Sequence, residues 1–188
     1  MFQKPLSSKA YLALLQPRHA QEMSALINCN RSYLRQWLPW VDATRTVFDS
    51  KTWIHGALKQ FIDNRELHAG LWFEESLAGV IGSRFYWQNH SAVIGYWLGA
   101  EYQGKGLMTL ACQAFLEHCF VSLGLNRVEI RCAAQNVRSQ AIPERLGFRE
   151  EGLLREAEWL YDHYVDHVVY GLLAKEWEQG ICPGTKPI

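Results

Sequence analysis

The chain has 188 residues, a length typical of one domain, and 48% of them are hydrophobic. Its 19 basic and 19 acidic side chains cancel, so the formal net charge is zero. A nucleic-acid-binding protein normally carries a basic excess, because neutralising phosphates drives its affinity. We therefore expect a single domain over 1–188, with a core at about 10–175, a peripheral tail at 178–188 and no direct nucleic-acid binding.

Cysteine usage and hydropathy predict a cytoplasmic protein. The five cysteines include no C-x-x-C pair, and their odd number argues against a disulfide framework. The apolar run at 10–15 is too short for the core of a signal peptide. No stretch of about 18 uncharged apolar residues occurs, so the sequence predicts no membrane span.

The first third of the chain predicts one strand and two helices. Ala10–Leu15 is apolar enough for a strand, and Pro17 then opens a helix, where its missing N–H costs nothing. The aromatic segment 33–40 ends this part at a proline-containing turn. Asp49 or Ser50 is then expected to cap a second amphipathic helix.

Three strands, a loop and a long helix are expected next. The strands are Leu67–Phe73, Leu77–Trp87 and Ser91–Leu98. A tight hairpin at 74–76 joins the first two strands, and a turn at 88–90 leads to the third. A loop over 99–105 precedes an amphipathic helix that starts at Leu107 and ends at Gly124.

The last part alternates between strand and helix. Arg127–Ala133 has the alternation of a strand, and 136–146 reads as a helix. Two final strands at 148–154 and 164–173 are joined through 156–163. The predicted order is β, α, α, β, β, β, α, β, α, β, β. This mixed order predicts an α/β or α+β sheet flanked by helices.

The most informative segment is Tyr102–Thr109, which reads YQGKGLMT between a strand and a helix. Its glycines permit positive φ angles and a close approach of a ligand to the backbone. The free N–H groups of the first helical turn and the helix dipole together favour an anion such as pyrophosphate. An ordinary strand-to-helix turn is the alternative. Neither G-x-x-x-x-G-K-[ST] nor G-x-G-x-x-G matches.

This loop resembles the acetyl-CoA pyrophosphate loop of the GNAT N-acetyltransferase superfamily, [QR]-x-x-G-x-[GA]. Gln103 and Gly106 match that pattern, and Met108 departs from it in the way typical of the RimJ/RimL-type branch. The block 136–148 is similar to the superfamily's N-x-x-S-x-x-x-x-E-[KR]-L-G-F. The segment 151–164 resembles ribosomal-protein-serine acetyltransferases. The chain is thereby identified as a member of this superfamily over roughly 10–175.

The resemblance implies a mostly antiparallel twisted sheet with a V-shaped splay between two parallel strands, Ser91–Leu98 and Arg127–Ala133. Acetyl-CoA would lie in that opening, with its pantetheine arm on the main chain of the first strand. The family uses no metal for this reaction. The implied acetyl-CoA-binding residues are Tyr96, Trp97, Leu98, Gln103, Gly104, Lys105, Gly106, Leu107, Met108, Thr109 and Asn136.

The resemblance also implies direct attack of a primary amine in a ternary complex. Glu158 is the expected base, beside the aromatic Trp159, although most glutamates are simply solvated. Ser139 is expected to donate a hydrogen bond to the leaving sulfur. Either Ser139 or Asn136 could instead cap the helix. Tyr164 is a possible substitute for the serine.

Several other residues allow both a functional and a structural interpretation. Trp37 and Trp40 could line the acceptor groove or pack in the core. His163 and His167 have the i, i+4 spacing of a helical zinc site, but their apolar neighbours favour a strand that separates them. Cys132 is expected to be a small buried side chain, and a mixed disulfide with coenzyme A is conceivable.

The expected acceptor is a protein N-terminal α-amine, as in ribosomal-protein-serine acetyltransferases. Such an amine has a pKa of about 7.7–8.0, so a useful fraction is neutral at pH 7. One alternative is an acetyltransferase of a small amine such as an antibiotic, a polyamine or an amino-acid derivative. Another is a non-catalytic acyl-CoA-binding sensor. The resemblance also makes a homodimer possible.

Overall fold

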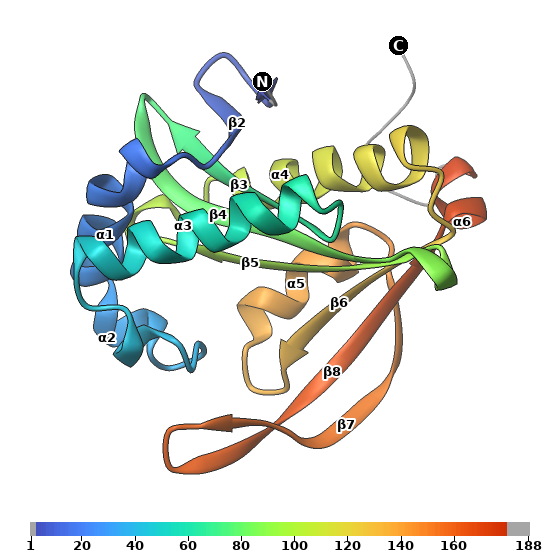
Figure 1. The fold of residues 1–188 in the computed structure, drawn as a ribbon. Coiled ribbons are helices and arrows are strands. Elements are labelled where there is room, and N and C mark those ends of the chain that lie inside the picture. The colour runs from blue at the N-terminus through green and yellow to red at the C-terminus, as the bar shows by residue number, and fades with distance from the viewer. Residues whose placement is uncertain (1–2, 180–188) are drawn as a thin grey trace.

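The computed structural model describes residues 3–179, and all of its strands join one sheet (Figure 1). The sheet has eight strands in the order β1-β2-β3-β4-β5-β6-β8-β7, and β5 and β6 form its one parallel pair. The strands are β1 Gln3–Pro5, β2 Ala10–Leu14, β3 Glu66–Phe73, β4 Ser76–Tyr86, β5 Ser91–Leu98, β6 Arg127–Ala133, β7 Arg149–Leu160 and β8 His163–Leu173. The predicted mixed, mostly antiparallel sheet is thus confirmed.

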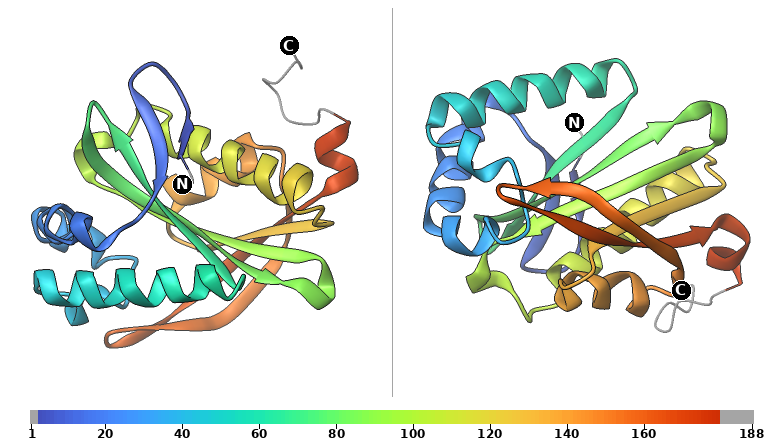
Figure 2. Two further views of the ribbon diagram at one scale, coloured as in Figure 1. Left: turned by 45° about the horizontal axis from the view of Figure 1, so that its top comes forward. Right: turned by 90° about the horizontal axis from the view of Figure 1, so that it is seen from below.

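Helices cover the two faces of the sheet unequally (Figure 2). The helices within the described residues are α1 Ala20–Cys29, α2 Arg31–Leu34, α3 Val47–Ile62, α4 Leu107–Glu117, α5 Val137–Arg145 and α6 Ala174–Glu178. The larger core packs α4 and α5 against one face, with Phe115 completely buried. A smaller core packs α1 and α3 against β2, β3 and β4 on the other face. Within residues 3–179, no helix covers β5 to β8 on that second face.

The helix α3 corrects the predicted cap. Thr46, rather than Asp49 or Ser50, precedes the helix as its N-cap. Asp49 stands at the third helical position, where its Oδ2 accepts a hydrogen bond from the Thr46 N–H at 2.8 Å. The Asp49 N–H donates in return to Thr46 Oγ1 at 3.2 Å. The two side chains form a capping box, which moves the start of the helix upstream.

The connection predicted between the last two strands is wrong. β7 runs on to Leu160 and pairs with β8 in a long hairpin that contains a bulge between Leu154 and Glu158. Glu156 adopts a φ of 51°, and its N–H donates to Asp166 Oδ1 at 2.7 Å. The bulge interrupts the alternation of side chains, so the sequence pattern reads as a loop.

Short terminal elements were also missed, namely β1, α2 and α6. The long helix continues after α4 as a π-helical turn, and Gly124 follows with a φ of 62°, which confirms it as the stop. Most of the tail predicted at 178–188 lies outside the described residues. Of the helices in residues 3–179, none is long and apolar enough to cross a membrane.

The parallel strands β5 and β6 separate part of the way along their length. They pair from Ser91 with Arg127 as far as Ile94 with Ile130. β5 nevertheless continues to Leu98 beside β4, and β6 continues to Ala133 beside β8. The predicted V-shaped splay is therefore present between 95–98 and 131–133.

Candidate active site

The splay exposes main-chain groups on two facing strand edges. Because the other edge of each strand is fully paired, the groups that face the gap need another partner. Side chains alternate along β5, so Tyr96 and Leu98 pack toward the α4 and α5 face, whereas Trp97 packs toward the α1 and α3 face. A ligand with amide groups, such as a pantetheine arm, fits this edge as an additional strand would.

The glycine loop ends at the first turn of α4, next to the splay. Gly104 and Gly106 have φ angles of 72° and 73°, and a Cβ on either would meet nothing within 4 Å. Gly106 is the N-cap and offers no side chain to the first turn, whose first helical bond is Leu110 N–H to Gly106 O at 3.1 Å. The N–H groups of Leu107, Met108 and Thr109 therefore face open space, and the residues present fit a diphosphate.

Two arginines from α5 add positive charge beside this loop. Arg138 Nη1 donates to Gln103 Oε1 at 2.8 Å, and Gln103 also donates to the Tyr33 hydroxyl. Arg145 Nη1 donates to Thr109 Oγ1 at 3.1 Å. The sequence analysis did not find Arg138, because only the packing of α5 against α4 brings it to the loop. Lys105 instead lies over the Phe73 ring, 5.0 Å from its centroid.

Ser139 lies at the gap with a hydroxyl that is not used as the helix cap. Asn136 caps α5, since its Oδ1 accepts from the Ser139 N–H at 3.1 Å. Ser139 Oγ lies 3.2 Å from Cys132 Sγ on β6 and donates to the Tyr96 hydroxyl at 3.4 Å. The Tyr96 hydroxyl donates to Ser139 O at 3.0 Å. Strand register and the helix start thus bring Tyr96, Cys132 and Ser139 together.

Burial determines the charge of this cluster. Burial raises the pKa of the Tyr96 hydroxyl well above its usual range, and it also raises the pKa of the Cys132 thiol. Both groups keep their protons at neutral pH. The cluster is therefore suited to donating hydrogen bonds. The sequence analysis assigned only the main chain of Tyr96 and missed its hydroxyl.

Glu158 lies on the other face of the sheet. It pairs with Val165 across the β7–β8 hairpin, and its Oε2 lies 3.5 Å from His167 Nε2. His167 pairs with Ala133 at the end of β6, which places both side chains beside the splay. Glu158 remains 33% exposed, so it is accessible to a ligand. Ser139 and Glu158 thus approach the gap from opposite faces. The sequence analysis missed the proximity of His167 to Glu158, which follows from strand register.

The remaining candidate residues from the sequence are Trp37, Trp40, Tyr164 and His163. Trp40 packs against Trp97 with ring centroids 5.9 Å apart, and Trp37 is half-buried in the same segment. Tyr164 is 57% exposed and contacts Trp159 edge-on, on the opposite side of the hairpin from Glu158. His163 pairs with Asp162 instead of His167. Within residues 3–179, no group of three or more His, Cys, Asp or Glu side chains could hold a metal ion.

Comparison with known proteins agrees with this geometry. The acetyltransferase (GNAT) domain family matches residues 10–149. YdaF of Bacillus subtilis, whose name assigns it provisionally to the ribosomal N-acetyltransferases, is 36% identical over 95% of this chain and 98% of its own. The ribosomal-protein-serine acetyltransferase of Escherichia coli is 31% identical over 88% of this chain and 93% of its own.

A solved structure superposes closely on the fold. It is RimL, a ribosomal L7/L12 α-N-protein acetyltransferase in complex with coenzyme A, in which a cysteine forms a disulfide with the coenzyme. It is 25% identical, covers 92% of this chain and 98% of its own, and gives a TM-score of 0.88. The chain belongs to the GNAT acetyltransferase family. It is an N-acetyltransferase with acetyl-CoA as its acetyl donor.

Proposed function

We propose that this enzyme acetylates the α-amine of a protein N-terminus, and that the polypeptide is a ribosomal protein. The names of the Escherichia coli and Bacillus subtilis relatives support this acceptor class. The observation that carries the proposal is the open face of the sheet beside the splay. A Cβ on Gly95, at the start of the gap, would meet nothing within 4 Å, so a polypeptide can approach here.

Acetyl-CoA supplies the acetyl thioester, and the residues of this chain hold it and move protons. The amides of Leu107–Thr109, aided by Arg138 and Arg145, would hold the diphosphate, and the free edge of β5 would hold the pantetheine arm. Asn136 shapes the start of α5. The Ser139 hydroxyl, which donates to the Tyr96 hydroxyl in this structure, would turn its proton to the leaving sulfur.

The acceptor amine would enter from the opposite face. Glu158, beside His167, would take the proton that the amine loses, either directly or through a water molecule. At pH 7 roughly one α-amine in ten is neutral, against roughly one lysine side chain in several thousand. The reaction at an N-terminus therefore needs only a modest base, and one carboxylate on an open face suits that task.

Mass spectrometry tests the acceptor class. The purified enzyme would be incubated with acetyl-CoA and two matched panels. One panel contains peptides that begin with Ser, Ala, Met or Thr, each with a free and a blocked α-amine. The other contains small amines, including aminoglycosides, polyamines and amino-acid derivatives. We expect acetylation of free peptide N-termini and none of the blocked peptides.

Acetylation of small amines alone would replace the proposal with a small-molecule acetyltransferase. Binding of acetyl-CoA without transfer to either panel would favour a sensor. A cytoplasmic location goes with a ribosomal acceptor and is part of the proposal. The homodimer that the resemblance implies stays a prediction, and light scattering measures it.

A further inference from the structure

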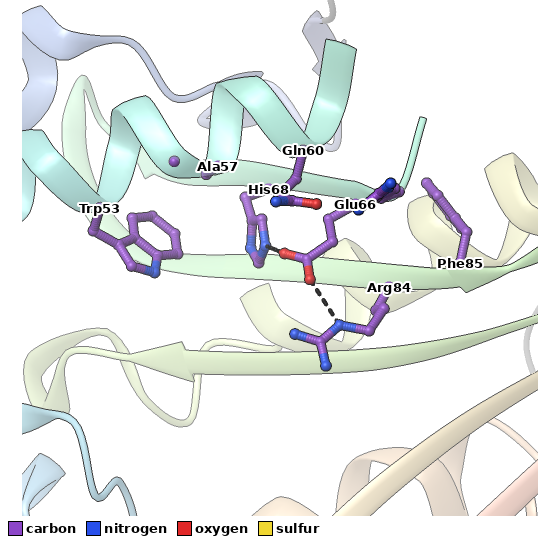
Figure 3. A pocket seen from close by; sticks show the side chains of 9 residues that line it. Trp53, Ala57, Gln60, Glu66, His68, Arg84 and Phe85 are labelled. Atoms are coloured by element: carbon purple, nitrogen blue, oxygen red, sulfur yellow. Dashed lines mark hydrogen bonds and ion pairs between the residues drawn. The ribbon is translucent and has the colours of Figure 1, made fainter. Parts of the chain in front are cut away.

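A cavity of about 710 Å³ lies between α3 and the strands β3 and β4, away from the gap (Figure 3). None of its side chains has a part in the proposed acetyl transfer. It is lined by Trp53, Gly56, Ala57, Gln60, Arg65, Glu66, His68, Arg84 and Phe85. The lining thus combines two aromatic rings with several charged groups.

The cavity opens on the same face of the sheet as Glu158. Directly paired residues on adjacent strands point to the same side, and His68 pairs with Gly82, which pairs with Gly95. The missing side chain of Gly95 leaves a shallow path from the splay that ends at the His68 ring. The His68 ring rests directly on Gly82, because a Cβ there would lie 2.2 Å from His68 Nδ1. The space above Gly95 is open.

The length of this path can be counted in acceptor residues. Neighbouring strands are about 4.8 Å apart, so β3 lies about 10 Å from β5, and an extended chain advances about 3.3 Å per residue. An acceptor whose α-amine is at the splay would therefore place its third or fourth residue beside His68 and Arg84. The first two residues would cross the glycine path.

The hydrogen-bonding groups of the cavity favour an anion. Glu66 already uses both oxygens, one accepting from Arg84 Nε at 2.7 Å and the other 2.8 Å from His68 Nε2. The Arg84 side chain remains 64% exposed, and its contact with Glu66, drawn as a dashed line in Figure 3, uses only Nε. Arg65 forms no ion pair with any residue of 3–179. The Glu66 carboxylate is thus neutralised, and Arg65 adds a positive charge that no carboxylate of residues 3–179 balances.

We propose that this cavity binds an acidic side chain at the third or fourth residue of the acceptor polypeptide. Arg84 would hold the carboxylate, Arg65 would add charge, and Trp53 would cover the stem of the side chain. Trp53 is positioned for this by its edge-on contact with His68, 5.0 Å between centroids. The inference rests on the proposed N-terminal acceptor. It adds that the enzyme selects acceptors by the side chain at their third or fourth residue.

A peptide scan tests the inference. Peptides of one parent sequence would carry Asp at one position from 2 to 6, with Asn at the same position as the matched neutral partner. For the wild type we expect kcat/KM to be about two- to fivefold higher with Asp at position 3 or 4, because an ion pair with an exposed guanidinium adds a small gain over a neutral hydrogen bond. The effect should appear in KM, with kcat unchanged.

Variants assign the preference to the cavity. Arg84→Gln should reduce the Asp-to-Asn ratio to near one while leaving the rate with neutral peptides unchanged. Arg84→Glu should reverse the preference in favour of Lys at that position. Lys175→Gln, an exposed cation on α6, is the control and should keep the wild-type ratio. If Arg84→Gln does not fold, Arg84→Lys, which retains the charge, should keep the preference for Asp.

The outcomes separate this inference from the proposed function. Acetylation of peptides with equal kcat/KM at every Asp position overturns the inference and leaves the N-terminal acceptor standing. A preference that survives Arg84→Gln overturns it as well. Acetylation of no peptide overturns both the function and the inference.

Discussion

Ser139 and Glu158 have separate tasks because they lie on opposite faces of a splayed sheet. Asn136 caps α5, so the Ser139 hydroxyl is left to contact Cys132 and Tyr96. The raised pKa values of Tyr96 and Cys132, both caused by burial, keep these groups protonated. Proton uptake from the amine therefore falls to the other face, where Glu158 lies beside His167.

Glu158→Gln tests this division of tasks. The amide has the size of the carboxylate but cannot accept a proton at neutral pH, so we expect kcat to fall by about 10²–10⁴-fold. The Kd of acetyl-CoA should not change, because the coenzyme contacts the other face. Steady-state kinetics and isothermal titration calorimetry measure the two quantities.

Glu156→Gln is the matched control for this variant. It is exposed on the same strand and holds the bulge through its main-chain N–H rather than its carboxylate. Its kcat should equal that of the wild type. Wild-type turnover in Glu158→Gln would mean that another group takes the proton.

The elements on either side of the glycine loop, β5 and α4, position its N–H groups for an anion. β5 delivers the chain to the loop, and α4 starts immediately after Gly106 without a side-chain cap. The Leu107 and Met108 side chains point into the core, 3% and 5% exposed, so only their N–H groups face outward. The loop is therefore a main-chain site whose shape depends on two positive φ angles.

Gly106→Val tests the loop. Valine at a φ of 73° is strained, and its branched side chain would occupy the open space in front of the amides. We expect coenzyme A binding to be lost in calorimetry, with a cost in stability of about 1–2 kcal/mol.

Gly124→Val separates strain from binding. Gly124 has a φ of 62° and equally open surroundings, but it follows the far end of the long helix. It should lose similar stability in thermal unfolding and bind coenzyme A normally. Equal loss of binding in both variants would attribute the effect to destabilisation, and normal binding in Gly106→Val would exclude the loop as the diphosphate site.

The parts of this fold that the sequence predicts are those with local signals. The strands at 91–98 and 127–133 are confirmed, because each pattern is contained in one short segment. The role of the glycine loop as a diphosphate site stays a prediction. The bulge at Glu156 is not predicted from the sequence, because it depends on a hydrogen bond to Asp166 on the next strand. For the same reason the motifs name Ser139 and Glu158 as candidates, whose roles stay predictions, but do not indicate the faces on which they lie. Tyr96 comes close to Ser139, and His167 to Glu158, only through the strand pairing and packing of the folded chain.

On the scale of the whole molecule, the long hairpin closes the open face against the N-terminal half of the chain (Figure 2). Tyr161, at the tip between β7 and β8, donates its hydroxyl to Leu38 O at 2.7 Å. The Arg35 guanidinium lies over its ring, 3.8 Å from the centroid, and also pairs with Asp42. Glu158 is three residues from this contact. These contacts therefore hold the hairpin tip in place close to the proposed base.

Tyr161→Phe tests whether this closure serves the acceptor. The ring and its contact with Arg35 are retained, and only the hydrogen bond to Leu38 O is lost, at a cost of about 1 kcal/mol. We expect a severalfold higher KM for the peptide, an unchanged Kd for coenzyme A, and faster hydrogen exchange at the hairpin tip. Tyr11→Phe, a ring stacked on Trp72 far from the hairpin, should change none of these values. A parallel loss of coenzyme A affinity in Tyr161→Phe would show that the hairpin supports the whole sheet, because the coenzyme would approach from the face that Tyr161 does not close.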